Sequence, residues 1–232
     1  TLVVNFKYNS GITTKDVTTL QTNVLSKIAI YGADTLENFT GMFRYSKLIE
    51  NINSADTSIL SNITTVKMYK YFTPTLNSAL KYTLNFNNAF YNPHSEHNKS
   101  AGGIISSTGF KINDDDSASE HFLDDDGNGN LRVYYLSGTT RIYTDSTYGT
   151  VDYATGEVIL TSAHLTSISN VDGAASTQVR VFTIPSSNDI VPVRNQILSI
   201  DTSNSSITGE VDAIASGSSQ AGTAYTTSSS YS

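Results

Sequence analysis

A run of acidic and amide side chains lies in the middle of the chain, from Asp124 to Asn130, and its spacing could bind calcium. Oxygen ligands stand at the first, third and fifth positions of the run, and Gly129 stands at the sixth. The loop of a helix–loop–helix calcium site has this pattern, with a bidentate glutamate at the twelfth position. Tyr135 occupies that position here, and the flanking segments favour strands. We therefore interpret the run as a polar turn between strands, with calcium binding as the alternative.

A second acidic cluster, Asp114, Asp115 and Asp116, lies in a serine-rich context. Three adjacent like charges are typical of a solvated loop. A glycosidase holds two carboxylates across a cleft, and nothing in the sequence places such a pair. The chain also has no tryptophan to stack on a sugar. Hydrolysis of glycosides is therefore not expected.

The histidines could in principle bind a metal ion. His94, Glu96 and His97 supply ligand atoms, but they lie in a stretch rich in Pro, Asn and Ser rather than on a helix that would fix their geometry. His121 and His164 stand alone. No nucleophile elbow, phosphate-binding glycine loop or dinucleotide fingerprint occurs. The sequence thus predicts a protein that is not an enzyme, with no catalytic residue, no metal site and no cofactor.

Composition restricts the partners. The formal net charge of the 232 residues is −7, only 15% of them are charged, and the few basic residues are scattered. Such a surface repels phosphate groups, so nucleic acid and anionic membranes are poor partners. The longest apolar stretch, residues 24–33, contains Lys27 and is too short to cross a bilayer. The absence of cysteine excludes disulfides. Because the chain starts at Thr1 within a strand-like segment, we expect it to be a piece of a longer protein.

Residues 1–92 predict a compact β-α-α-β-β unit with helices on one face of a sheet. The most regular element is a helix over residues 13–31, which Thr13 could cap and Gly32 could end. Its apolar side chains recur at helical spacing, namely Val17, Leu20, Val24, Leu25 and Ile28. The other predicted elements are strands at 2–8, 59–71 and 80–90 and a short helix after Tyr45.

Residues 93–201 predict a β-rich domain of short antiparallel strands, so the fold class is α+β. Turns rich in Gly, Asn and Asp separate the expected strands, which are residues 103–112, 131–136, 141–143, 150–153, 157–160, 178–183 and 197–200. Residues 151–159 predict a hairpin in which Gly156 takes the left-handed conformation. Residues 202–232 form a tail rich in Ser, Thr and Gly, with too few apolar residues to fold alone.

The order of these elements resembles a known family. The stretches that carry the resemblance are LVVNFKYN, FRYSKLIENINSADTSILSN, TTVKMYKYFTPTLN and LNFNNAFYNP, followed by GNGNLRVYY, YGTVDYATGEVIL and NDIVPVRNQILSID. They are similar to the C-terminal part of the baseplate wedge subunits of T-even-type contractile-tailed bacteriophages, which are related to baseplate J-like proteins. The resemblance extends to about residue 201, and the tail from Thr202 departs from it.

The resemblance implies a structural protein of the virion tail, assembled in the host cytoplasm. In that family, two copies sit in each of six wedges and contact one another and other wedge proteins, closing a ring around the tail tube. The missing N-terminal region would join a helical bundle with a larger wedge subunit. No small-molecule substrate is implied.

Tyrosines on successive predicted strands are candidates for copy-to-copy contacts, because Tyr provides contact area without buried charge. They are Tyr134, Tyr135, Tyr143, Tyr148 and Tyr153. An equally open interpretation is that half of them pack in the β core. For the whole chain, the alternative function is a carbohydrate- or host-surface-binding β module, as in an adhesin or a tail fibre. A hydrolase fits the residues least, because no acid, base and nucleophile are assembled.

Overall fold

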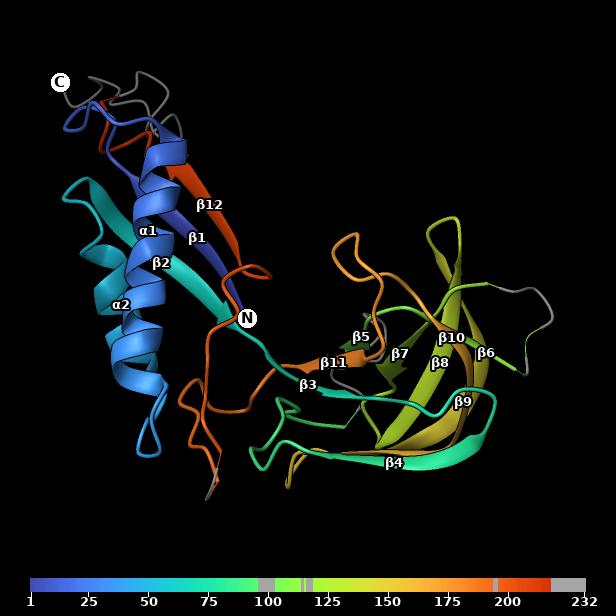
Figure 1. Ribbon diagram of the computed structural model, residues 1–232. Helices are drawn as coiled ribbons and strands as arrows, with labels where there is room; N and C mark the ends of the chain where they lie inside the picture. Colours follow the sequence, from blue (N-terminus) through green and yellow to red (C-terminus); the bar gives the residue numbers. More distant parts are fainter. Residues whose placement is uncertain (96–102, 114, 116–118, 194–195, 218–232) are drawn as a thin grey trace, which may run out of the picture. The chain divides into compact units, whose positions relative to one another are not determined.

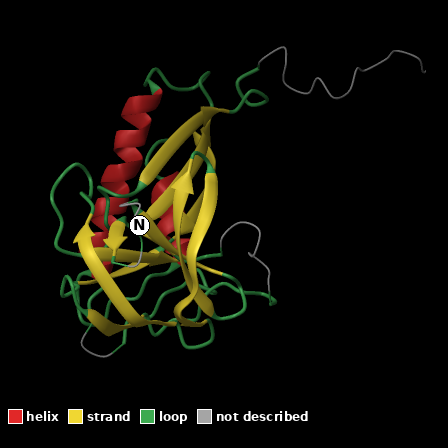
Figure 2. Ribbon diagram, turned by 90° about the vertical axis from the view of Figure 1, so that its right-hand side faces the viewer, coloured by secondary structure: helices red, strands yellow, loops and turns green. Residues whose placement is uncertain are grey.

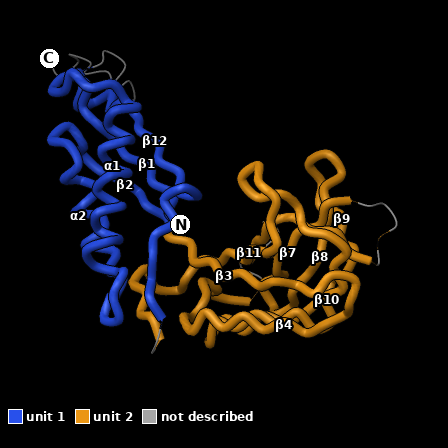
Figure 3. The backbone as a smooth tube through the Cα atoms, viewed as in Figure 1, with its two compact units in different colours: residues 1–65, 194–232 blue, residues 66–193 orange. Residues whose placement is uncertain are grey.

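The computed structural model describes residues 1–95, 103–113, 115, 119–193 and 196–217 (Figure 1). The chain forms two compact units (Figure 3). The first unit contains residues 1–65 and 194–232, and the second contains residues 66–193. Within the described residues, both α-helices belong to the first unit, while strands make up the second (Figure 2). The α+β class with a β-rich second part is confirmed.

Helix α1 (Val17–Tyr31) is amphipathic, as the sequence predicts. Its buried side chains follow the expected stripe and are Leu20, Val24, Ile28 and Tyr31. The helix begins later than predicted, because Asp16 caps it in place of Thr13. The Asp16 carboxylate accepts the amide of Thr19 at 2.7 Å, which satisfies one of the donors that a helix start leaves unpaired.

A short π-helical turn, η1 (Gly32–Leu36), and a loop lead from α1 to α2 (Tyr45–Asn53). Leu48 and Ile52, one turn apart, are the buried residues of α2. The Tyr31 hydroxyl fixes the chain where α2 begins: it donates to the Arg44 carbonyl oxygen at 3.2 Å and accepts the Arg44 amide at 3.0 Å. These two hydrogen bonds connect the end of α1 to the start of α2.

The sheet of the first unit has three strands. Strand β1 (Leu2–Tyr8) lies in the centre, between β12 (Ser206–Val211) and β2 (Ile59–Val66). Every second residue of β1 is buried, which is the alternation expected of a strand covered on one face. Both helices lie on that face (Figure 1). The predicted arrangement of helices on one face of a sheet is therefore present.

Strand β12 changes the interpretation of the 202–232 tail. It pairs in parallel with β1, so that Val3 stands opposite Ser206 and Tyr8 opposite Val211. Its side chains are exposed or half-buried, so backbone hydrogen bonds, which apolar patterning does not reveal, hold most of it in place. Residues 202–217 thus belong to the first unit. Residues 218–232 lie outside the described residues.

Gly209 allows β12 to lie close to α1. A Cβ at this position would come within 2.5 Å of the Phe6 ring and 2.9 Å of a Val17 methyl group. Phe6 is 1% exposed and has no room to move away. A side chain at position 209 would therefore force the strand away from the helix layer.

The second unit contains a six-stranded sheet, five strands of which close into a ring. Its order is β4-β10-β6-β7-β8-β9, and β10 also pairs with β9. The strands are β4 (Ala79–Asn85), β6 (Phe110–Ile112), β7 (His121–Asp125), β8 (Asn130–Ser137), β9 (Thr140–Asp152) and β10 (Glu157–Ile168). The neighbours are antiparallel.

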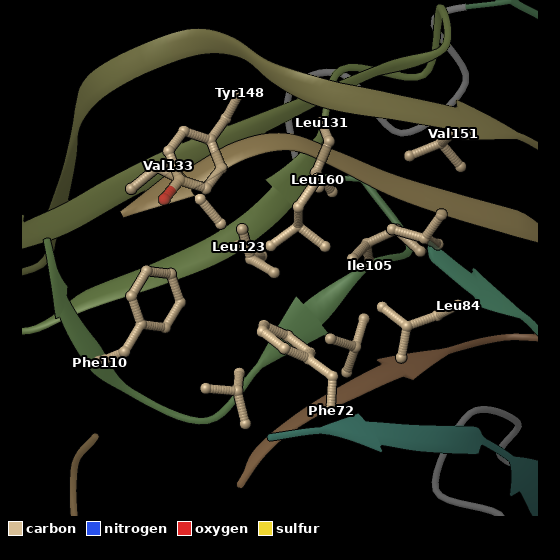
Figure 4. Packing of buried hydrophobic residues seen from close by; sticks show 14 of the residues in the cluster. Phe72, Leu84, Ile105, Phe110, Leu123, Leu131, Val133, Tyr148, Val151 and Leu160 are labelled. Carbon is tan, nitrogen blue, oxygen red and sulfur yellow. The ribbon is translucent and has the colours of Figure 1, made fainter. Parts of the chain in front are cut away.

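The hydrophobic core of the second unit is enclosed by this sheet. Phe110, Leu123, Leu131, Val133 and Leu160 are each fully buried in it (Figure 4). A smaller sheet, of order β3-β11-β5, contributes further core residues from β3 (Met68–Phe72) and β11 (Val179–Thr183), while β5 (Ser106–Ser107) contributes none. One continuous apolar cluster therefore joins both sheets.

The hairpin between β9 and β10 agrees with the sequence. Gly156 has a φ of +73°, the left-handed conformation that its turn requires. Both strands are longer than predicted: β9 joins two segments that the sequence suggested were separate, and residues 197–200 form no strand.

The division of the chain differs from the boundaries expected at residues 92 and 201. Strand β3 pairs with β11, and β4 pairs with β10, so residues 66–92 share the core of the second unit. The sequence shows the strands but not their partners, because alternation specifies which face of a strand is buried and not which strand lies beside it.

Gly209→Ala tests the packing of β12. We expect it to destabilise the first unit by about 1–3 kcal/mol, the usual cost of adding a methyl group to a filled core. Urea unfolding measured by circular dichroism gives the change. Thr208→Ala, on the exposed face of the same strand, is the control and should stay within about 0.5 kcal/mol. Equal stability of both variants would contradict the pairing of β12 beneath α1.

A pH titration tests the ion pair that links the start of α1 to the turn before β2. Lys15 Nζ lies 2.5 Å from Asp56, whose carboxylate also accepts the Ser58 amide and hydroxyl. The Lys15 hydrogen bond, followed by those from Ser58, lowers the Asp56 pKa to about 2. The stabilisation is present above the unfolded pKa of about 3.9 and is lost as the pH falls through about 2.

Asp56→Asn should therefore be less stable than the wild type at neutral pH, by roughly 1 kcal/mol because Lys15 is half exposed. The difference should shrink between pH 4 and pH 2. Urea midpoints of both proteins measured across this range provide the test. A difference that stays constant with pH would show that Asp56 is not ionised and paired as described.

Candidate protein interface

Six side chains form a connected cluster on the outer side of β7, β8 and β9. Alternation on these strands sends Leu123, Leu131 and Val133 into the core, so their neighbours point outward. The antiparallel register places Asp124 opposite Arg132, Phe122 opposite Tyr134, and Tyr134 opposite Tyr143. We call Phe122, Asp124, Arg132, Tyr134, Arg141 and Tyr143 the Arg–Tyr face.

Asp124 is the centre of this face, and its carboxylate is 1% exposed. One carboxylate oxygen accepts Arg132 Nε at 2.9 Å. The other accepts Arg141 Nη1 at 2.7 Å and the Tyr143 hydroxyl at 2.9 Å. A buried carboxylate is tolerated only when it is paired and hydrogen-bonded, and these three donors meet that requirement.

The two guanidinium groups also stack on the tyrosine rings. Arg132 Cζ lies 4.3 Å from the centre of the Tyr143 ring, and Arg141 Cζ lies 4.6 Å from that of Tyr134. Arg favours such contacts because its guanidinium is planar and weakly hydrated. The rings of Tyr134 and Tyr143 are themselves 5.9 Å apart. Each member of the face except Phe122 is therefore held by at least two others, and Phe122 packs against Tyr134.

Burial governs the protonation of this face. It raises the pKa of the Asp124 carboxyl, while Arg132, Tyr143 and Arg141 favour the charged form and oppose the shift. Burial also raises the pKa of the Tyr134 and Tyr143 hydroxyls. Both phenols remain protonated at neutral pH, so Tyr143 stays a hydrogen-bond donor to Asp124.

The cluster carries two guanidinium groups and one carboxylate, which leaves a local excess of positive charge on a chain of net charge −7. Arg132 is 11% exposed, whereas the Arg141 side chain is 35% exposed. Arg132 therefore serves the internal network, and Arg141 presents part of its guanidinium to solvent. Rigid Arg and Tyr side chains of this kind are enriched in protein interfaces.

The neighbouring aspartates Asp125 and Asp126 have separate tasks. Asp125, fully buried, accepts the amides of Ile104 and Ile105, each at 2.7 Å, and the Tyr153 hydroxyl at 2.6 Å. Asp126 accepts the amides of its own turn, from Asn128 at 2.8 Å and Asn130 at 3.0 Å.

Three adjacent carboxylates thus turn to three different sets of donors and do not converge on one point. The run from Asp124 to Asn130 forms the polar turn between β7 and β8 that the sequence suggested as the first interpretation. Across the described part of the chain, no three His, Asp or Glu side chains are grouped so that they could share a metal ion.

His121 is fully buried, and both of its ring nitrogens have partners. Nδ1 lies 2.9 Å from the Ser119 carbonyl oxygen, and Nε2 lies 3.0 Å from an Asp115 carboxylate oxygen and 3.1 Å from the Thr144 hydroxyl. Nδ1 must carry a proton, because a carbonyl oxygen only accepts. The sequence suggested that His121 stands alone. In the structure it instead connects the segment before β7 to β9.

The other residues singled out from the sequence do not join this network. His94 contacts the Ser95 carbonyl oxygen, and His164 lies on β10. Glu96 and His97 lie outside the described residues, as do Asp114 and Asp116.

The five predicted interface tyrosines fall into three places. Tyr134 and Tyr143 belong to the Arg–Tyr face. Tyr135 packs edge-on against His121 at 5.7 Å, Tyr148 lies in the core, and Tyr153 packs against the core and donates to Asp125. Tyr134 and Tyr143 share a surface because they are directly opposite in the pairing of β8 with β9, whereas Tyr135, the next residue along β8, points to the other face.

The arginines and Asp124 were not among the predicted site residues, although the sequence holds a signal for them. A tight turn at residues 126–129 makes positions 124 and 132 face each other across the hairpin, and likewise 122 and 134. An Asp opposite an Arg and a Phe opposite a Tyr are favourable cross-strand pairs. The pairing of β9 with β8 could not be predicted from turn length in the same way, because two register shifts interrupt it.

Comparison with known protein families gave a match within the first part of the chain. Residues 2–71 match the family described as Baseplate structural protein gp6, C-terminal domain III. This segment includes β1, α1, α2 and β2 of the first unit. The match supports a structural component of a phage baseplate, and thus of the virion tail, and the family is not one of enzymes. No curated protein matched the chain. Neither described helix is long and apolar enough to span a bilayer.

Asp124→Ala tests whether the carboxylate organises the Arg–Tyr face. Its removal leaves two partly buried guanidinium groups without their shared acceptor, and we expect a loss of about 3 kcal/mol in unfolding free energy. The control is Asp172→Asn, which removes the charge of a surface pair with Arg180 at 3.3 Å, keeps a residue type that tolerates the φ of +54° at this position, and should cost less than about 1 kcal/mol. Chemical denaturation of both variants decides between them. A loss at Asp124 as small as the control's would mean that the network is dispensable.

Proposed function

We propose that the protein is a structural subunit of the tail baseplate of a contractile-tailed phage, acting as a wedge subunit. Its copy-to-copy and wedge-to-wedge contacts would build the inner ring of the baseplate around the tail tube, with two copies in each of six wedges. It would assemble with other wedge proteins in the host cytoplasm and would bind no small-molecule substrate.

The observation that carries this proposal is the match of residues 2–71 to a domain of a baseplate structural protein. The matched residues supply the central strand, both helices and one edge of the first sheet. The resemblance of the later segments up to about residue 201 to wedge subunits supports the same assignment for the second unit. The acidic, weakly charged composition fits a protein whose partners are other proteins.

We assign the Arg–Tyr face to one of these protein contacts, with Tyr143, which is 37% exposed, as the aromatic side chain that can meet a partner and Tyr134, which is 8% exposed, packed behind it. The stacked and hydrogen-bonded side chains are already ordered, so a partner would not have to order them on binding. The excess positive charge favours an acidic partner surface, and Arg141 is the member placed to meet a carboxylate. Tyr135, Tyr148 and Tyr153 would support this face from within.

The alternative of a carbohydrate-binding module has less support from this surface. A sugar stacks on the open face of an aromatic ring. Here Arg141 covers a face of Tyr134, and Arg132 covers a face of Tyr143. Tyr134 is moreover only 8% exposed. A glycan array probed with the full chain would detect such binding if it exists.

Location in the particle tests the proposed function directly. In phage particles that contain the protein, gold-labelled antibodies against the chain should bind at the baseplate end of the tail in electron micrographs. Purified tails should retain the protein together with other baseplate subunits. Labelling of fibre tips alone, together with a positive glycan array, would support the alternative function instead.

Arg141→Ala tests the assigned contact in the same particles. We expect the amount of protein retained in purified tails to fall about tenfold or more, because truncating a central interface arginine costs about 2 kcal/mol or more. Lys81→Ala, at an exposed position of β4, removes the same charge and should leave retention unchanged. Thermal unfolding confirms that each variant is folded. Equal retention of both variants would remove the Arg–Tyr face from the contacts.

A further inference from the structure

Strand β2 is an open edge of the first unit's sheet. The strand order β12-β1-β2 places it at the end, and among the described residues it pairs with β1 alone. The backbone groups on the other side of an edge strand can hydrogen-bond to a further strand. The kind of partner that fits this edge is therefore defined by the edge itself: an extended polypeptide segment.

The sequence of this edge lacks the usual protection. Residues 57–66 read TSILSNITTV and contain no charged residue, no proline and no glycine. Soluble proteins normally guard an exposed edge with charge, proline, a bulge or a very short strand, because an unguarded one joins other chains. Strand β2 is eight residues long and rich in β-branched side chains. An edge of this composition is expected to be covered in the working assembly.

The exposure of apolar side chains on β2 supports the same conclusion. Ile63 is 75% exposed and Leu60 is 45% exposed, which is unusual for apolar residues of a strand unless they are covered by a partner. The Tyr45 hydroxyl donates to the Thr64 carbonyl oxygen at 3.0 Å, so α2 engages the last part of the strand. The open portion is therefore the segment from Ile59 to Ile63.

The opposite edge of the sheet is shorter and carries charge. Strand β12 has six residues, and it carries Gly209 and the charged Glu210. Asp201 and Asp212 flank it in the sequence. Two copies of this acidic edge would repel each other, whereas β2 itself is uncharged and the charges that flank it, Asp56 and Lys67, are of opposite sign. In a chain of net charge −7, an uncharged strand is the edge best suited to contact an identical copy.

We propose that β2 pairs with β2 of a second copy of this chain, antiparallel about a twofold axis, so that the two three-stranded sheets join into one. Identical strands related by a twofold axis meet in antiparallel orientation, and the contact is closed after two copies. The inference deepens the proposed function by naming one copy-to-copy contact, and it rests on that function for its place in the baseplate. The contact is separate from the Arg–Tyr face.

Cysteine cross-linking tests the pairing, because the chain has no native cysteine. Ser61→Cys and Ile63→Cys alter exposed positions in the open portion of β2, and Thr208→Cys alters an exposed position of β12. Residues directly opposite in an antiparallel pair have Cα atoms about 4.5–5.5 Å apart, which a disulfide can span. The β2 variants, alone and mixed in pairs, should form disulfide dimers under mild oxidation, and Thr208→Cys should stay monomeric on a non-reducing gel.

Sedimentation velocity of the full chain gives a second measurement that does not depend on cysteine. The wild type should dimerise, and Ile63→Lys should weaken the association constant at least tenfold by placing like charges at the twofold contact. Thr208→Lys should have no such effect. A monomeric wild type, a dimer that Ile63→Lys leaves intact, or cysteines that link as readily on β12 as on β2 would overturn the proposal. If residues 218–232 covered β2 instead, none of its cysteines would cross-link, which also overturns it.

The two proposals fail separately. A chain found at the baseplate by antibody labelling whose β2 cysteines do not cross-link keeps the proposed function and loses the β2 contact. A chain that cross-links through β2 but is absent from the baseplate loses the function and keeps the contact.

Discussion

The parallel pairing of β1 with β12 is the contact on which the first unit depends, and it joins residues about two hundred positions apart. Parallel neighbours always need a long connection, and here that connection includes the whole second unit. Side-chain contacts fix both ends of the pairing: the Ser205 hydroxyl accepts the Leu2 amide at 3.0 Å, and the Ser216 hydroxyl accepts the Ser10 amide at 3.1 Å. Without residues 196–217, β1 would be an edge strand, and the sheet beneath the helices would have two strands in place of three.

In the second unit, the two-residue period of a strand divides neighbouring acids between opposite sides of one sheet. Asp124 points outward to the arginines, and Asp125 points inward to the amides of Ile104 and Ile105. Each carboxylate is buried and each is neutralised by donors fixed in place. Asp124 orders the Arg–Tyr face, and Asp125 holds the loop at residues 104–105 against the closed sheet. Two adjacent acidic residues therefore stabilise two separate parts of the second unit.

Low charge connects these structures to assembly. A chain with 15% charged residues and an acidic balance has few strong ion pairs to offer a partner, and the contacts that we propose for it rely on a backbone edge and on Arg stacked with Tyr. Both of these are geometrically demanding and give specificity at modest cost in desolvated charge. Among the described residues, the buried side chains of Asp124, Asp125 and His121 are each hydrogen-bonded within the fold.

The sequence by itself determined the local elements: α1 with its buried stripe, the alternation of β1, the Gly156 hairpin and the polar turn at residues 124–130. These follow from periodicity and turn chemistry, which act over a few residues. Tertiary structure alone decided the partners: β12 beside β1, β3 and β4 in the second unit, Arg141 and Tyr143 beside Asp124, and His121 paired with Asp115. Strand pairing uses backbone groups that every residue carries, so a sequence pattern shows which face is buried and leaves the neighbour to be settled by the packing of the whole chain.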